Sequence, residues 1–214
     1  QWVSAYDYTS HLDDSAIKVV ISGSNLTVTG PVTISTNNYK LATLTYAQSN
    51  GSLTATNIST VTTTSSVTAV TDLTSDGSGN IYIVGSSFVS GQGYNYYVQK
   101  LNSTLVSAWT YTYNGASNLD DVTRAVQVDA SGNVYISGYS TSSTQGRNIV
   151  TMKLNSSGTL QWTQTINGSG NGDDEGADMI LDASANLYLT GYQTLSSTNT
   201  NKAAFKCVYQ RVCR

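Results

Sequence analysis

A repeat of about 53 residues is the feature that most constrains what this chain can fold into. The decapeptides DGSGNIYIVG, DASGNVYISG and DASANLYLTG begin at Asp76, Asp129 and Asp182, at equal spacings of 53 residues. A shorter copy, SGSNLTVTG, spans residues 22–30. Because a short repeat must bury its apolar residues against its neighbours, a fixed period predicts one array of similar units.

Tryptophans keep the same spacing and set the number of units. Trp109 and Trp162 are 53 residues apart, and Trp2 lies 107 residues before Trp109, which is twice the period within one residue. Four units therefore fill the 214 residues as a single domain. Their approximate limits are 1–55, 56–108, 109–160 and 161–214.

Each unit has the pattern of short β-strands separated by tight turns. In the third unit the runs TRAVQVD, NVYISG, NIVTMKL and TLQWTQTI alternate in polarity or are rich in β-branched and aromatic residues. The segments ASGN, STSSTQGRN and NSSG between them are rich in turn-forming residues. Four antiparallel strands per unit of this length are typical of a β-propeller blade. The sequence therefore predicts an all-β propeller of four four-stranded blades.

The repeat also resembles a known bacterial family. The segments WTYTYNGASNLDDVTRAVQVDASGNVYISGYS and QWTQTINGSGNGDDEGADMILDASANLYLTGYQ are similar to the SBBP type of β-propeller repeat. The resemblance covers units three and four closely, unit two from Asp76 onward and unit one in outline, and it ends after Lys206. It implies an exported or cell-surface protein with no shared catalytic residues.

The composition agrees with a secreted β-protein and argues against several functions. Charged residues make up 11% of the chain, where about a quarter is usual. The Lys and Arg residues are scattered and the formal net charge is −3, so the basic surface that nucleic acid binding requires is not expected. No apolar run reaches the length of about 18 residues that suggests a membrane span.

Acidic pairs precede a predicted inner strand in three units, and all should emerge on one face of the propeller. Closely spaced carboxylates suit Ca²⁺ or a polyhydroxylated ligand, and repulsion between neighbouring carboxylates favours a cation. The other interpretation, which we favour, is that they accept hydrogen bonds from loop amides, with no cofactor. The residues are Asp13, Asp14, Asp120, Asp121, Asp173 and Asp174.

The motif DASGN at 129–133 fits a turn better than a calcium loop, because it offers one carboxylate and no later Glu. Gly132 and Asn133 both tolerate positive φ there.

A second set of charges is expected near the propeller axis, where Lys18, Asp72 and Asp178 align. In a ring closed at four blades Lys18 would lie between the two aspartates, either as a structural ion pair or as solvated charges.

The ends of the chain leave three arrangements open. Residues 1–7 match the fourth strand of later units, and residues 202–209 match a third strand. Pairing within one chain would close the ring, and pairing between molecules would give a dimer or a fibre. The third arrangement is a piece of a larger ring. Cys207 and Cys213 either form a small terminal disulfide or are an accidental pair.

Catalysis has little support in the sequence. His11 is the only histidine, so repeated zinc ligands are not available and a Ser-His-Asp triad would rest on one loop residue. We therefore expect a non-enzymatic structural or interaction module outside the cell, which self-associates or binds other surface proteins. The alternatives are a propeller that binds glycans and, third, a polysaccharide hydrolase that uses a carboxylate pair.

Overall fold

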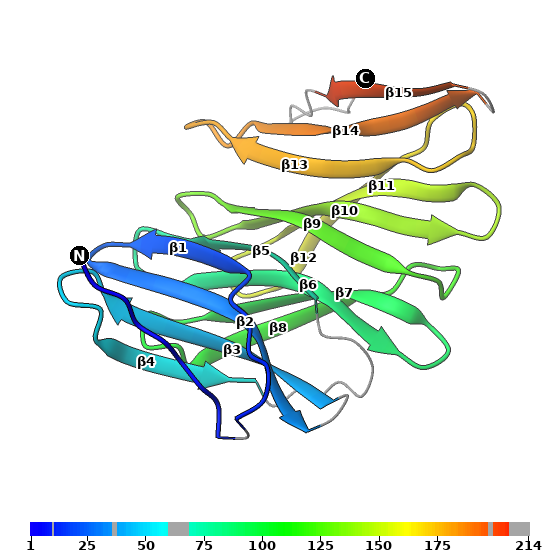
Figure 1. The fold of residues 1–214 in the computed structure, drawn as a ribbon. Helices are drawn as coiled ribbons and strands as arrows, with labels where there is room; N and C mark the ends of the chain where they lie inside the picture. The colour runs from blue at the N-terminus through cyan, green and yellow to red at the C-terminus, as the bar shows by residue number, and fades with distance from the viewer. Residues whose placement is uncertain (10, 36–37, 60–68, 197–198, 206–214) are drawn as a thin grey trace.

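The computed structural model describes residues 1–9, 11–35, 38–59, 69–196 and 199–205. These residues form fifteen β-strands in four antiparallel sheets, and no helix occurs among them (Figure 1). A helix long and apolar enough to cross a membrane is accordingly not found in the described ranges. The predicted all-β fold with one sheet per repeat is confirmed.

Every sheet is a meander in which consecutive strands are hairpin partners. The first sheet contains β1 (Lys18–Ser22), β2 (Asn25–Ser35), β3 (Asn38–Ala47) and β4 (Leu53–Ile58). The second contains β5 (Ala69–Ser75), β6 (Ile81–Val89), β7 (Gly93–Leu101) and β8 (Ser107–Tyr113). The third contains β9 (Asp121–Val128), β10 (Val134–Ser142), β11 (Gly146–Leu154) and β12 (Leu160–Ile166). The fourth contains β13 (Glu175–Leu181), β14 (Leu187–Ser196) and β15 (Asn199–Phe205).

The sheets do not start where the sequence units start. Trp109 and Trp162, which open the third and fourth units, lie in β8 and β12, the last strands of the second and third sheets. The second and third sheets therefore take their fourth strands from the beginning of the next unit, and β4 of the first sheet crosses the boundary between units one and two. Among the described residues the fourth sheet has three strands.

The core lies between the sheets, because alternate residues of each strand point to opposite neighbours. Ile81 and Ile83 of β6 belong to a cluster shared with the first sheet. Tyr82 and Val84 of the same strand belong to a cluster shared with the third sheet. Residues on both faces are completely buried, and burial of each such side chain contributes roughly 1.5–3 kcal/mol.

The four sheets follow one another as an open series. The first strands of successive sheets are in contact, β1 with β5, β5 with β9 and β9 with β13. Within the described ranges, no extensive contact joins the fourth sheet to the first. Figure 1 shows these two sheets at opposite ends of the series.

The N-terminal segment packs on the first sheet and not on the last. Residues 1–8 form no strand. The Trp2 Nε1 donates a hydrogen bond of 2.8 Å to the Gln48 carbonyl, and its ring stacks on Tyr46 of β3. Among the described residues β15 pairs with β14 alone, so residues 1–7 do not pair with residues 202–205 of the same chain, because the first and fourth sheets lie apart. Residues 206–209 of the expected third strand lie outside the described residues.

Candidate functional site

The repeated Asp76, Asp129 and Asp182 organise turns. In each turn one carboxylate oxygen accepts hydrogen bonds from the backbone amides two and four residues later, with N–O distances of 2.8–3.0 Å. The other oxygen accepts the Asn side chain four residues later and the Tyr hydroxyl six residues later. The carboxylate is therefore occupied by protein donors, as the turn interpretation predicts.

These hydrogen bonds govern the ionisation of the turn carboxylates. Burial opposes the charge on Asp129, but hydrogen bonds from Asn133, Ser131 and Tyr135 outweigh it and hold its pKa below the usual value. The positive φ of the turn lies on its fourth residue, which is Gly132 in the third sheet and Ala185 in the fourth, with φ of 77° and 58°. The neighbouring Asn133, which also tolerates positive φ, does not adopt it.

The second aspartate of each acidic pair caps its own loop. Asp14, Asp121 and Asp174 each accept a backbone amide six residues earlier, from Tyr8, Gly115 and Gly168, at 2.8, 2.6 and 2.5 Å. Asp121 and Asp174 are completely buried. Burial raises the pKa of Asp121, and hydrogen bonds from Ser140 and Gly115 oppose that effect. These three residues are therefore structural acceptors.

The first aspartate of two pairs joins neighbouring sheets. The Asp120 Oδ1 accepts the amide of Tyr94, in the second sheet, at 3.0 Å. The Asp173 Oδ1 accepts the amide of Arg147, in the third sheet, at 3.0 Å. Asp13, the corresponding residue of the first pair, is exposed. Among the described residues no three His, Cys, Asp or Glu side chains gather in a way that could hold a metal ion.

Only part of the expected axial cluster comes together. The Lys18 Nζ lies 3.6 Å from the Asp72 Oδ1, and the Asp72 Oδ2 accepts the amide of Val126 at 3.0 Å. Asp178 does not join Lys18, because the first and fourth sheets lie apart, and its Oδ1 instead accepts the amide of Met179. The expectation that Lys18 lies between two aspartates is therefore wrong for this structure. Cys207 and Cys213 lie outside the described residues.

Sequence reasoning missed an arginine cluster between the third and fourth sheets. Arg124 and Arg147 both approach the ring of Tyr139, at 5.6 and 4.5 Å from its centroid, and both pair with Glu175. A polar hollow of about 290 Å³ beside them is lined by Asp120, Tyr139 and Arg147. Because neither arginine recurs in the other units, the repeat gave no signal for this cluster.

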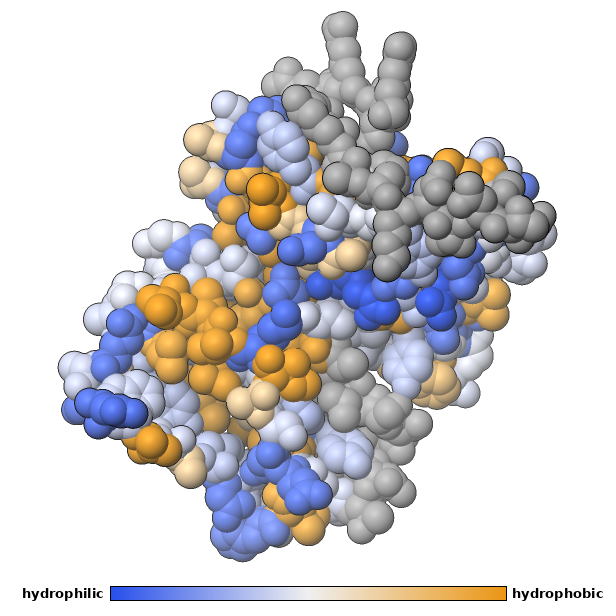
Figure 2. Space-filling view, turned by 45° about the horizontal axis from the view of Figure 1, so that its top comes forward, coloured by the Kyte–Doolittle hydropathy of each residue, from blue (hydrophilic) through white to orange (hydrophobic). Residues whose placement is uncertain are grey.

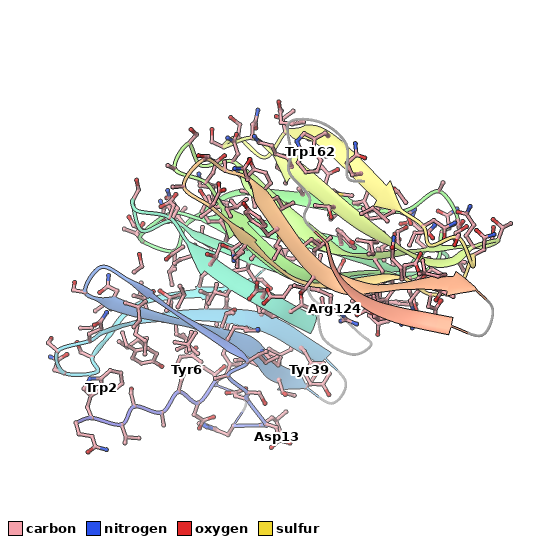
Figure 3. All side chains as sticks on the ribbon, turned by 90° about the horizontal axis from the view of Figure 1, so that it is seen from above. Trp2, Tyr6, Asp13, Tyr39, Arg124 and Trp162 are labelled. Carbon is pink, nitrogen blue, oxygen red and sulfur yellow. The ribbon has the colours of Figure 1, made fainter. Side chains whose placement is uncertain are left out.

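The outer face of the first sheet is apolar and incompletely covered. Leu26, Val28 and Leu44 line a hollow of about 260 Å³ beneath Trp2 and Tyr6. Figure 3 shows both aromatic rings between the N-terminal segment and the first sheet. Beside the hollow, β1 and the residue before it expose apolar side chains. These are Ile17, Val19 and Ile21.

Hydrophobic surface gathers where this first sheet lies, at the left of the view in Figure 2. On β1 the exposed Val19 and Ile21 alternate with Val20, which packs into the core shared with the second sheet. One face of β1 is thus part of the core, and the other has no comparable cover. We define the uncovered face as the exposed Val19 and Ile21 together with the half-buried Leu26 and Val28.

Comparison with solved structures identifies the architecture. An endo-arabinase from Bacteroides thetaiotaomicron matches 98% of this chain and 80% of its own, with a TM-score of 0.50 and 15% identity. The β-propeller domain of the trilobed protease from Pyrococcus furiosus matches 90% of this chain and 59% of its own, with a TM-score of 0.48 and 9% identity. The fold is that of a β-propeller.

A third solved structure, BamB from Moraxella catarrhalis, matches 94% of this chain and 66% of its own, with a TM-score of 0.42 and 12% identity. No protein-family model and no curated protein matches the sequence. Similarities at these identities show the fold alone.

Proposed function

We propose that this propeller is a non-enzymatic structural or protein-interaction module, exported or displayed on a bacterial surface, as its SBBP-like repeats suggest. The observation that carries the proposal is the uncovered face of the first sheet. Val19 is 59% exposed and Ile21 is 65% exposed on a strand whose opposite side is in the core. Contiguous exposed apolar surface of this kind marks interaction sites on soluble proteins.

The geometry of the acidic pairs argues for the same function. Asp121 and Asp174, the most plausible catalytic carboxylates by their position, are completely buried and accept backbone amides. A carboxylate pair that cleaves a glycosidic bond must face the substrate on both sides of that bond. These aspartates serve the loops instead, which favours a binding role over a hydrolytic one.

A photoreactive residue on the uncovered face tests the proposal. We would replace Val19 with p-benzoylphenylalanine, irradiate the full chain in its native cells and identify protein adducts by mass spectrometry. Val106 is the matched control, because it is equally exposed, at 60%, and lies in the turn before β8. Protein adducts from position 19 and not from position 106 support the proposal. Equal labelling, or no labelling, overturns it.

The polar hollow supports one alternative, the binding of glycans. Tyr139, Asp120 and Arg147 offer an aromatic ring and charged hydrogen-bonding groups in one concavity, which is a combination that suits sugars. Binding on a glycan array that is lost in a Tyr139→Ala variant would favour this alternative over the interaction module.

A further inference from the structure

The two ends of the sheet series carry complementary halves of an interface that the chain already forms internally. An apolar core joins each pair of successive sheets. Between the second and third sheets, and between the third and fourth, backbone amides also donate hydrogen bonds to carboxylates of the neighbouring sheet. The first sheet has the surface that receives a preceding sheet. The fourth sheet has the surface that receives a following one.

The apolar half of the interface is apparent from equivalent residues of the first and third sheets. By strand pairing, Leu26 and Val28 of β2 correspond to Val134 and Ile136 of β10. Val134 and Ile136 are completely buried against the second sheet, whereas Leu26 and Val28 line a hollow. The chain's own packing therefore shows that a sheet of the same repeat fits this face.

Val19 of β1 is also exposed where its equivalent in the third sheet is buried. It occupies the position of Val126 in β9, since both residues pair with the equivalent strand positions Val28 and Ile136. Val126 has no exposed surface, but Val19 is 59% exposed. The difference lies in the presence of a preceding sheet, and not in the residue type.

The polar half of the interface consists of backbone amides of one sheet that donate to aspartates of the next. Asp120 and Asp173 accept hydrogen bonds from the amides of Tyr94 and Arg147, the second residues of the third strands of the preceding sheets. The corresponding residue of the fourth sheet is Thr200, which pairs with Thr194 as Arg147 pairs with Thr141. The exposed Asp13 is therefore placed to accept the amide of Thr200 from a sheet docked on its face.

A second polar contact adds charge complementarity. Asp72 accepts the amide of Val126, in the following sheet. Asp178 has the place of Asp72 in the fourth sheet, and Val19 has the place of Val126 in the first. Docking would bring the Asp178 carboxylate to the amide of Val19 and close to the Lys18 ammonium. A positive charge on one surface and a negative charge on the other would fix the register.

The N-terminal segment already occupies the position of a fourth strand from a preceding sheet. The Trp109 Nε1 of β8 donates to the Ser156 carbonyl in the turn of the third sheet, at 3.0 Å. The Trp2 Nε1 makes the same bond to the Gln48 carbonyl in the turn of the first sheet. The fourth sheet pairs β15 on one side only among the described residues, and such an edge accepts an added strand.

We propose that the uncovered face of the first sheet binds the fourth sheet of a second copy of this chain, with residues 1–7 added beside β15 of that copy. This inference rests on the proposed function and names its partner. A second copy is favoured over the chain's own fourth sheet because the two surfaces lie at opposite ends of the series (Figure 1). Such a head-to-tail contact closes into a ring or continues as a filament.

The mass of the purified full chain in solution tests the proposal, measured by sedimentation velocity over a range of concentrations. The wild type should associate. Val19→Asp should raise the dissociation constant by about tenfold or more, because association would then bury a charge in place of an apolar side chain. The control Val106→Asp adds the same charge at an equally exposed site and should associate like the wild type. A wild type that stays monomeric at every concentration overturns the inference.

Isotope labelling separates the partners. Light chains with p-benzoylphenylalanine at position 19 are mixed with heavy unmodified chains and irradiated. Light–heavy adducts within β13–β15 support the second copy, and adducts within one light chain show closure of the ring and overturn it. If position 19 labels other proteins in cells but no second copy, this inference fails while the proposed function stands. If it labels nothing in either setting, both fail.

Discussion

Replacement of Asp129 by alanine tests how the repeated turn stabilises each sheet. The carboxylate accepts four hydrogen bonds, from the amides of Ser131 and Asn133, the Asn133 side chain and the Tyr135 hydroxyl. A hydrogen bond in a protein contributes about 1 kcal/mol net, and more when the acceptor is charged. Water replaces part of this loss in a partly exposed turn. We expect Asp129→Ala to lower the free energy of unfolding by about 2–3 kcal/mol.

The effect should depend on pH in a defined direction. Because the hydrogen bonds hold the pKa of Asp129 below its usual value, the folded state binds the proton more weakly than the unfolded chain, in which the pKa is about 3.9. The stabilisation is therefore complete above the unfolded pKa and is lost as the pH falls through the folded pKa. The difference in unfolding free energy between wild type and Asp129→Ala should shrink below about pH 4.

Urea denaturation followed by tryptophan fluorescence measures both effects. Ser131→Ala is the control, because it changes an exposed side chain of the same turn and leaves the amide in place. Asp129→Asn should fall between the wild type and alanine, since it keeps one acceptor oxygen and loses the charge. If Asp129→Ala costs less than about 0.5 kcal/mol, as surface substitutions usually do, or if its cost does not change with pH, the turn is not stabilised by this carboxylate.

Three further predictions concern single residues. Ala185→Gly should stabilise the chain by about 0.5–1 kcal/mol, because φ is 58° at Ala185 and a left-handed conformation strains any residue with a Cβ atom; an unchanged urea midpoint contradicts this. Gly138→Ala should lower the free energy of unfolding by about 3 kcal/mol, since the added Cβ would lie 2.0 Å from the Val122 carbonyl. Gly77→Ala is the control: its added Cβ would meet no atom within 4 Å, so the same denaturation assay should show little change. Burial raises the pKa of Asp121, so its charge opposes folding once the pH exceeds the pKa of the unfolded chain. Asp121→Asn should therefore have a melting temperature no lower than that of the wild type at pH 7. A calcium-dependent rise in the wild-type melting temperature that the variant loses would refute this structural role.

Local physical chemistry made much of the fold predictable from the sequence. A period of 53 residues between Asp76, Asp129 and Asp182 identifies the unit, and alternation within each run identifies the strands. The turn also follows from local residues, because its acceptor and its four donors all lie within six positions of one another. Even its exception is local, since Ala185 occupies a position that favours glycine.

The acidic pairs were only half predictable. Their recurrence before the first strand was apparent, and so was a capping role for their carboxylates. The partner of Asp120 was not, because the amide of Tyr94 lies in another sheet, 26 residues away in sequence. The cluster of Arg124, Arg147 and Glu175 was missed for a related reason, since it joins residues of two sheets without a repeated pattern.

The sequence by itself determined the unit, its strands and the polarity of each face, since these depend on contacts within a few residues and repeat in every copy. Only the tertiary structure decided which faces meet. Whether Lys18 lies near Asp72 alone or also near Asp178 depends on the angle between successive sheets, which accumulates over the whole series. A small rotation at each packed interface therefore separates a closed ring from an open one, and no short stretch of residues encodes that sum.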